Sequence, residues 1–90
     1  MRIYMQTIPS PDRPPRFYHL FLQEDLIDGW TLVRENGQQG SSGKVTKQHY
    51  DSWEDAQEAM LALRDKQVER GYQVVFVQGI SKANQAPPNS

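Results

Sequence analysis

The chain has 90 residues, a formal net charge of −1 at pH 7 and no cysteine. Disulfides and thiolate metal sites are therefore excluded, and no apolar stretch approaches the roughly 20 residues that a membrane-spanning helix needs. These features favour one small soluble domain, which we expect in the cytoplasm and without a secretory signal at its N-terminus.

The first sixteen residues combine a short strand-like stretch with four prolines. Residues 2–8 are a candidate edge strand, and the prolines that follow cannot donate to a sheet ladder. We therefore separate a proline-rich N-terminal segment, residues 1–16, from a folded domain expected over residues 17–80. The polar residues 81–90 are expected to be disordered.

Three strands are predicted after the prolines. Alternation in FYHLFLQE, residues 17–24, places apolar side chains on both faces, which is typical of a central strand. A turn signalled by Asp28 and Gly29 leads into a second strand over residues 30–35, and residues 44–50 form the third. Three successive antiparallel strands predict a meander.

An amphipathic helix is predicted after the third strand. Asp51 or Ser52 can cap its N-terminus, and Gly71 is typical of the position that follows the last turn. One stripe at the helical period collects the apolar residues Trp53, Ala56, Ala59, Met60 and Leu63. With a further strand over residues 72–77, the predicted fold class is α+β, an antiparallel sheet covered by one helix.

One hydrophobic core is expected between this sheet and the helix. The residues predicted to form it are Tyr18, Leu20, Trp30, Trp53, Met60 and Leu63. Leu61 and Val68 lie seven residues apart on the helix, away from its apolar stripe, and this core does not need them. They are a candidate surface for a protein partner, although single exposed apolar residues are also common on ordinary surfaces.

No constellation of catalytic or metal-binding residues is visible in the sequence. His19 and His49 lie on separate predicted strands, without ligand spacing to each other or to a carboxylate. The acidic residues of the helix are spread along its outer face, and no serine stands in a nucleophile elbow. We therefore expect no enzymatic activity, no metal site and no cofactor.

The stretch VRENGQQGSSGKV, residues 33–45, holds three of the six glycines of the chain. It is not a P-loop, because it lacks the Gly-Lys-Ser/Thr ending and leads into a strand. It predicts either a plain hairpin loop or a loop whose backbone N–H groups receive an anion, with positive φ at several glycines. Arg34, Lys44 and Lys47 flank it, and strand alternation points the two lysines to opposite faces.

Residues 17–77 resemble the WGR domain, which is named for a Trp-Gly-Arg motif. An aromatic-led strand, a Gly-Trp entry into the next strand, the glycine-rich loop, a basic strand, an Asp-Ser helix start and Arg-Gly-Tyr after the helix occur in the family's order. The chain is similar to short bacterial proteins that consist of this domain alone. In poly(ADP-ribose) polymerases the domain contacts the end of broken DNA, so the resemblance implies a non-catalytic module with DNA or another nucleic acid as its partner.

The motif itself is altered in this chain. Alignment places Asn36, Gly37 and Gln38 where the family has Trp, Gly and Arg, so the flat apolar surface and the positive charge are replaced. The resemblance therefore implies weak nucleic-acid binding through the loop and its basic neighbours, and the alternative is a protein-interaction module that has lost contact with DNA. The candidate binding residues are Arg34, Asn36, Gly37, Gln38, Gly40, Lys44 and Lys47.

Overall fold

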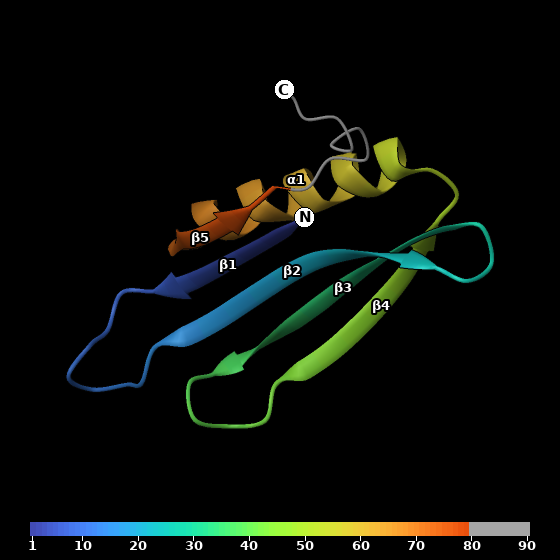
Figure 1. Cartoon of the computed structure of the whole chain (residues 1–90). Coiled ribbons are helices and arrows are strands. Elements are labelled where there is room, and N and C mark those ends of the chain that lie inside the picture. The colour runs from blue at the N-terminus through green and yellow to red at the C-terminus, as the bar shows by residue number, and fades with distance from the viewer. Residues whose placement is uncertain (80–90) are drawn as a thin grey trace.

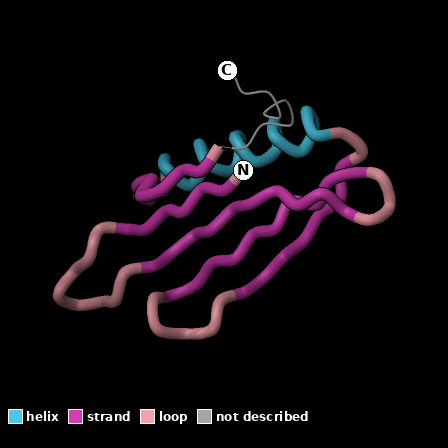
Figure 2. Tube along the Cα trace, viewed as in Figure 1, coloured by secondary structure: helices cyan, strands magenta, loops and turns pink. Residues whose placement is uncertain are grey.

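The computed structural model describes residues 1–79. The elements in chain order are β1 (Arg2–Thr7), β2 (Arg16–Asp25), β3 (Gly29–Gln38), β4 (Lys44–Tyr50), α1 (Trp53–Glu69) and β5 (Tyr72–Gln78). All neighbouring strands pair antiparallel in one sheet of order β4-β3-β2-β1-β5. Helix α1 packs along one face of this sheet (Figures 1 and 2), which confirms the predicted α+β fold.

Strand β1 does not lie at an edge of the sheet, as the sequence predicted, but between β2 and β5. It pairs with both neighbours over most of its length, and its inward residues Ile3 and Met5 are almost completely buried. The edge prediction was wrong because β5 returns past the end of α1 and takes the outer position. The prolines that suggested an edge lie in the connection between β1 and β2.

The predicted turn between β2 and β3 is present, and one of its two signal residues has the special backbone conformation. Asp28 has a φ of 65°, in the left-handed region that short polar side chains tolerate. Gly29 has no positive φ and begins β3 instead. A Cβ atom at Gly29 would collide with the His49 ring and lie 2.8 Å from the Tyr50 carbonyl oxygen, so this glycine permits the close approach of β4.

The core lies between α1 and the covered face of the sheet, as predicted. Trp30, Trp53 and Leu63 pack against its rim, partly buried. Its buried members are Ile3, Met5, Tyr18, Leu20, Leu22, Leu32, Ala56 and Met60.

The two residues of the candidate partner surface on the helix differ in their exposure. Leu61 packs partly buried against the core, whereas Val68 is 46% exposed. Leu61 and Val68 differ in exposure because α1 contacts β2, β3, β4 and β5. The part of the helix surface that faces the sheet is therefore wider than the predicted apolar stripe. Gln67, with 3% exposure, is buried on the same helix and was not anticipated, because it is polar.

The ends of α1 follow the predicted chemistry. Of the two candidate caps the structure selects Ser52, whose hydroxyl accepts a hydrogen bond from the Asp55 N–H at 3.1 Å. Gly71, with a φ of 104°, follows the C-terminal cap Arg70.

Within residues 1–79, no helix has the length and apolar character required to cross a membrane. The expectation of disorder over residues 81–90 falls outside the described residues.

Candidate functional site

The strand register sorts the predicted binding residues onto two faces of the sheet. Asn36 pairs with Tyr18 on one side and Lys44 on the other, all on the face that α1 covers. Arg34 lies two residues before Asn36 and shares that face. Lys47 pairs with Val33 and points to the open face. The predicted opposition of the two lysines is therefore confirmed, and Arg34, Asn36, Gln38 and Lys44 share the covered face, with Gln38 opposite Arg16.

The glycines of the β3–β4 loop serve close packing more than special backbone conformation. Only Gly40 has a positive φ there, at 87°, so the expectation of several such glycines was wrong. A Cβ atom at Gly43 would lie 2.9 Å from Cζ of Phe17, and one at Gly37 would lie 3.1 Å from the Cα of Gly43. The missing side chains therefore let the loop close against the Phe17 ring.

Hydrogen bonds within the same loop, and from the loop to Pro15 and Tyr4, hold it in place. The Ser41 N–H and hydroxyl both donate to the Gln38 carbonyl, at 3.1 and 2.8 Å. The Gln39 N–H donates to the Pro15 carbonyl at 2.9 Å, and its side-chain amide donates to the Tyr4 hydroxyl at 2.8 Å. Two backbone N–H groups that could receive an anion are thus already used. The geometry favours an anchored hairpin loop, with Gln38 exposed where β3 ends.

A polar pocket of about 440 Å³ lies where α1 ends over the strand ends. Its lining joins residues from β1, β2, β3, α1 and β5, namely Thr7, Arg16, Tyr18, Asn36, Gln67, Arg70 and Tyr72. A smaller hollow of about 270 Å³ adjoins it, because the two share Thr7, Arg16 and Arg70, and Arg13 lines this second hollow. We call the two hollows with Arg13, Arg16 and Arg70 the basic end.

The cations of the basic end are not neutralised by neighbouring carboxylates. Within residues 1–79, no ion pair involves Arg13, Arg16 or Arg70, and none of the residues that line the two hollows is acidic. Lys44 and Arg34 add two further cations next to Asn36. Unpaired guanidinium groups are strong, planar donors to phosphate and carboxylate oxygens. The basic end is therefore suited to an anion.

A second polar cluster joins the β2–β3 turn to the end of β4. Nδ1 of His49 lies 2.8 Å from Oδ2 of Asp25, and Nε2 of His49 lies 3.2 Å from Oδ1 of Asp51. The Thr31 hydroxyl donates to the same Oδ2 of Asp25 at 3.1 Å. The sequence spacing did not reveal these partners, because β4 reaches Asp25 only through the sheet register. Within residues 1–79, no group of three or more His, Cys, Asp or Glu side chains is arranged to hold a metal ion.

The carboxylates around His49 change its titration. The hydrogen bonds with Asp25 and Asp51 raise the pKa of His49 above its ordinary value of 6.5. Burial disfavours the charged form of Asp25, but the hydrogen bonds from His49 and Thr31 prevail and lower the pKa of that carboxyl. Both shifts favour an imidazolium at His49 beside the charged carboxylate of Asp25.

This cluster predicts a pH-dependent contribution to stability. A raised folded-state pKa means that the His49 contribution is complete below the ordinary value of 6.5 and is lost as pH rises through the raised pKa. His49→Gln should therefore lower the free energy of unfolding more at about pH 5.5 than at about pH 9. Urea denaturation of both proteins at the two pH values measures this difference. An equal loss at both would contradict a charged His49.

One comparison with known proteins identifies the fold family. The family model of the WGR domain matches residues 1–77. No significant match was found among curated proteins or solved structures. The match begins before β1 and reaches into β5, so it takes in the strand that the sequence had set apart as well as the altered motif. The chain belongs to the WGR domain family.

Proposed function

We propose that the chain is a non-catalytic module of the cytoplasm that binds DNA weakly, through phosphate contacts at the basic end. The WGR domain is a binding domain rather than a catalytic one, and it is known as a nucleic-acid-binding module in poly(ADP-ribose) polymerases. The observation that carries the proposal is the convergence of Arg16 and Arg70 on the pocket that Asn36 lines. Asn36 occupies the position of the motif tryptophan.

The geometry supports phosphate contacts better than recognition of a base. The two guanidinium groups can each offer paired N–H donors to phosphate oxygens, and the Asn36 amide can add a neutral donor. Asn36 offers no flat apolar surface against which a terminal nucleotide could pack. With a net charge of −1 on the whole chain, attraction is local and is screened beyond about 8 Å at physiological salt. Binding should therefore be near the non-specific range of about 10⁻⁴–10⁻⁶ M.

The candidate residues do not all join this proposed site. Arg34, Asn36 and Lys44 border it, whereas Lys47 lies on the opposite face. The alternative, a protein-interaction module, rested on Leu61 and Val68. Leu61 is partly buried against the core and Val68 is 46% exposed, so the geometry supports this alternative less well than nucleic-acid binding.

Salt dependence tests the proposal directly. Each phosphate contact contributes about 0.9 to the slope of log K against log salt concentration. Arg16→Gln and Arg70→Gln should each reduce this slope by about that amount for a 5′-phosphorylated DNA duplex. The measurement is fluorescence anisotropy at several salt concentrations, with the free energy of unfolding checked for each variant.

Arg64→Gln is the matched control for the loss of one charge. Its guanidinium already pairs with Asp65 at 2.8 Å and does not line the basic end. The slope should therefore stay at the parent value. Absence of duplex binding by the parent, or an equal effect of all three substitutions, would refute the basic end as the binding site.

A further inference from the structure

The face of the sheet opposite α1 carries a continuous group of aromatic rings. Phe17, His19 and Phe21 occupy alternate positions of β2, and Tyr4 of β1 pairs with His19 across the ladder. Ring centroids lie 6.3 Å apart for Tyr4 and Phe17, 5.8 Å for Tyr4 and His19, and 5.0 Å for His19 and Phe21. We call these four side chains the aromatic row. It lies on β1 and β2, interior strands of the sheet.

Two neighbouring parts of β3 and its loop adjoin the aromatic row: Val33 lies beside Phe21, and the glycines of the β3–β4 loop lie beside Phe17. Val33 is only 4% exposed although it belongs to the open face, and it pairs with Phe21 in the register. Phe17 packs against the glycines of the β3–β4 loop, and the Tyr4 hydroxyl accepts the hydrogen bond from Gln39. The rings remain partly exposed, and no helix or strand among residues 1–79 lies over them (Figures 1 and 2). A ligand would therefore meet ring surfaces that are already ordered.

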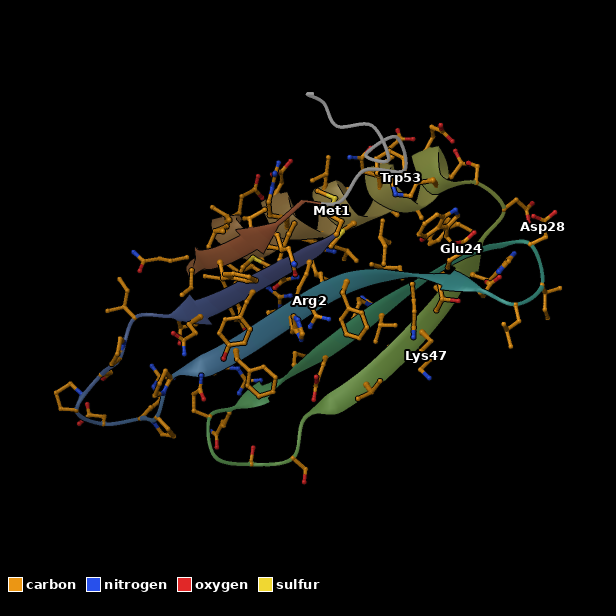
Figure 3. The ribbon with its side chains drawn as sticks, viewed as in Figure 1. Met1, Arg2, Glu24, Asp28, Lys47 and Trp53 are labelled. Carbon is orange, nitrogen blue, oxygen red and sulfur yellow. The ribbon has the colours of Figure 1, made fainter. Side chains whose placement is uncertain are left out.

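Two cations border the aromatic row. The Arg2 guanidinium lies 4.9 Å from the centre of the Phe21 ring, and one of its nitrogens is 3.1 Å from Nε2 of His19. Lys47 stands at the other end of the same line across the strands, which runs from Arg2 through Phe21 and Val33. Figure 3 labels both cations on the sheet. Neither forms an ion pair within residues 1–79.

Among residues 1–79, the carboxylates of the open face do not pair with Arg2 or Lys47, although Glu35 lies at the aromatic row itself. Glu35 lies 3.8 Å from Nδ1 of His19, and Asp25 is bound by Thr31 and His49. Arg2 and Lys47 thus remain available to an anion, Arg2 beside the Phe21 ring and Lys47 on the far side of Val33 from it. Aliphatic side chains would cover Val33 equally well. The burial of Val33 therefore does not by itself explain why aromatic rings and cations occur together on this face.

We propose that the aromatic row binds single-stranded nucleic acid, with bases stacked on its rings and phosphates in contact with Arg2 and Lys47. Stacking of bases on aromatic side chains tolerates any sequence, and flanking cations that follow the backbone are the usual complement. The site goes beyond the proposed function, because it lies on the opposite face of the sheet from the basic end. The protein would hold an unpaired strand on one face and phosphates of a duplex on the other.

Two labelled oligonucleotides of about ten nucleotides, within the usual range of site sizes, separate stacking from charge. One is oligo(dT), and the other is an abasic strand with the same phosphates. The parent protein should bind oligo(dT) more tightly in an anisotropy titration. Phe21→Leu keeps an apolar side chain next to Val33, removes one ring and leaves the Tyr4 hydroxyl that anchors the β3–β4 loop. It should weaken oligo(dT) binding by roughly fivefold to hundredfold and so reduce the preference for oligo(dT) over the abasic strand.

The basic-end variant Arg16→Gln with Arg70→Gln makes the two sites distinguishable. It should lose affinity for duplex ends yet keep the preference for oligo(dT) over the abasic strand, and the leucine variant should do the reverse. Equal binding of both oligonucleotides by the parent, binding of neither, or an undiminished preference in the leucine variant would overturn the proposal. Failure at duplex ends alone would bear only on the basic end.

A measurement on the parent protein covers the case in which the leucine variant does not fold. Added oligo(dT) should shift the aromatic NMR signals of Tyr4, Phe17 and Phe21. The signals of Trp30 and Trp53, which pack on the covered side, should stay in place. Shifts confined to the two tryptophans, or no shifts at all, would exclude the aromatic row as a binding site.

Discussion

Replacing Leu20 with alanine should lower the free energy of unfolding by about 2–5 kcal/mol. Leu20 has no exposed surface and stands in β2, paired with Ile3 of β1 and Arg34 of β3. Hydrogen-bonded ladders on both sides hold the backbone in place, so the surrounding chain cannot collapse fully into the vacated volume. Since small domains have only about 5–15 kcal/mol of stability, the variant should unfold at a much lower urea concentration.

Val68→Ala is the matched control on the exposed side of the helix. Val68 is 46% exposed, so its truncation should change stability by no more than about 0.5 kcal/mol. Fluorescence of Trp30 and Trp53, which pack against the core, reports the unfolding of both proteins. Equal small losses for Leu20 and Val68 would show that the core is not where the burial places it.

Local periodicity was sufficient to predict most of the elements. The alternation of Tyr18 and Leu20 with Phe17 and His19 identified β2 as a central strand, and its pairing with β1 and β3 confirms this. The position of β1 could not be predicted in the same way. It depends on a non-local pairing with β5, whose partner residues lie on the far side of the helix in the sequence. Ile3 and Met5 were therefore omitted from the predicted core.

The candidate site was predictable only where the motif and strand alternation both pointed to it. The family motif marked Asn36, and alternation placed Lys44 and Lys47 on opposite faces. Arg16 and Arg70 look like ordinary charged surface residues in the sequence. They meet only because α1 ends above the strand ends, which no short-range pattern encodes.

The exposure of the aromatic row also could not be predicted from the sequence. Phe17, His19 and Phe21 were recognised as the second apolar face of a central strand. Periodicity cannot show whether such a face is covered by another element. Only the topology, with a single helix on the opposite side of the described sheet, leaves these rings open to a ligand.

Restoring the family motif by Asn36→Trp and Gln38→Arg should raise affinity for DNA ends by about tenfold to hundredfold and steepen the salt dependence by about one unit. Asn36 lines the pocket of about 440 Å³ together with Arg16 and Arg70, so an indole there would lie beside the proposed phosphate contacts. Position 38 pairs with Arg16 in the register, so the new guanidinium would extend the same basic end.

Gly37→Val, added to the restored motif, should reverse that gain through packing rather than through backbone conformation. Gly37 has no positive φ, but a Cβ there would lie 3.1 Å from the Cα of Gly43, and a branched side chain would force β3 away from the loop. Position 36 would then move relative to Arg16. Anisotropy titrations of the parent, the restored motif, the restored motif with Gly37→Val, and Gly37→Val alone measure each step.

The outcome of this series separates two sources of affinity. If the restored motif leaves affinity unchanged while the protein stays folded, the loop plays no part in binding and the role carried over from the family is wrong. If the unaltered protein already binds ends tightly, the prediction of weak binding is wrong and residues outside the altered motif hold the end. Weak binding by the parent and a gain on restoration would mean that the basic end attracts phosphate, while the missing indole and charge set how firmly an end is held.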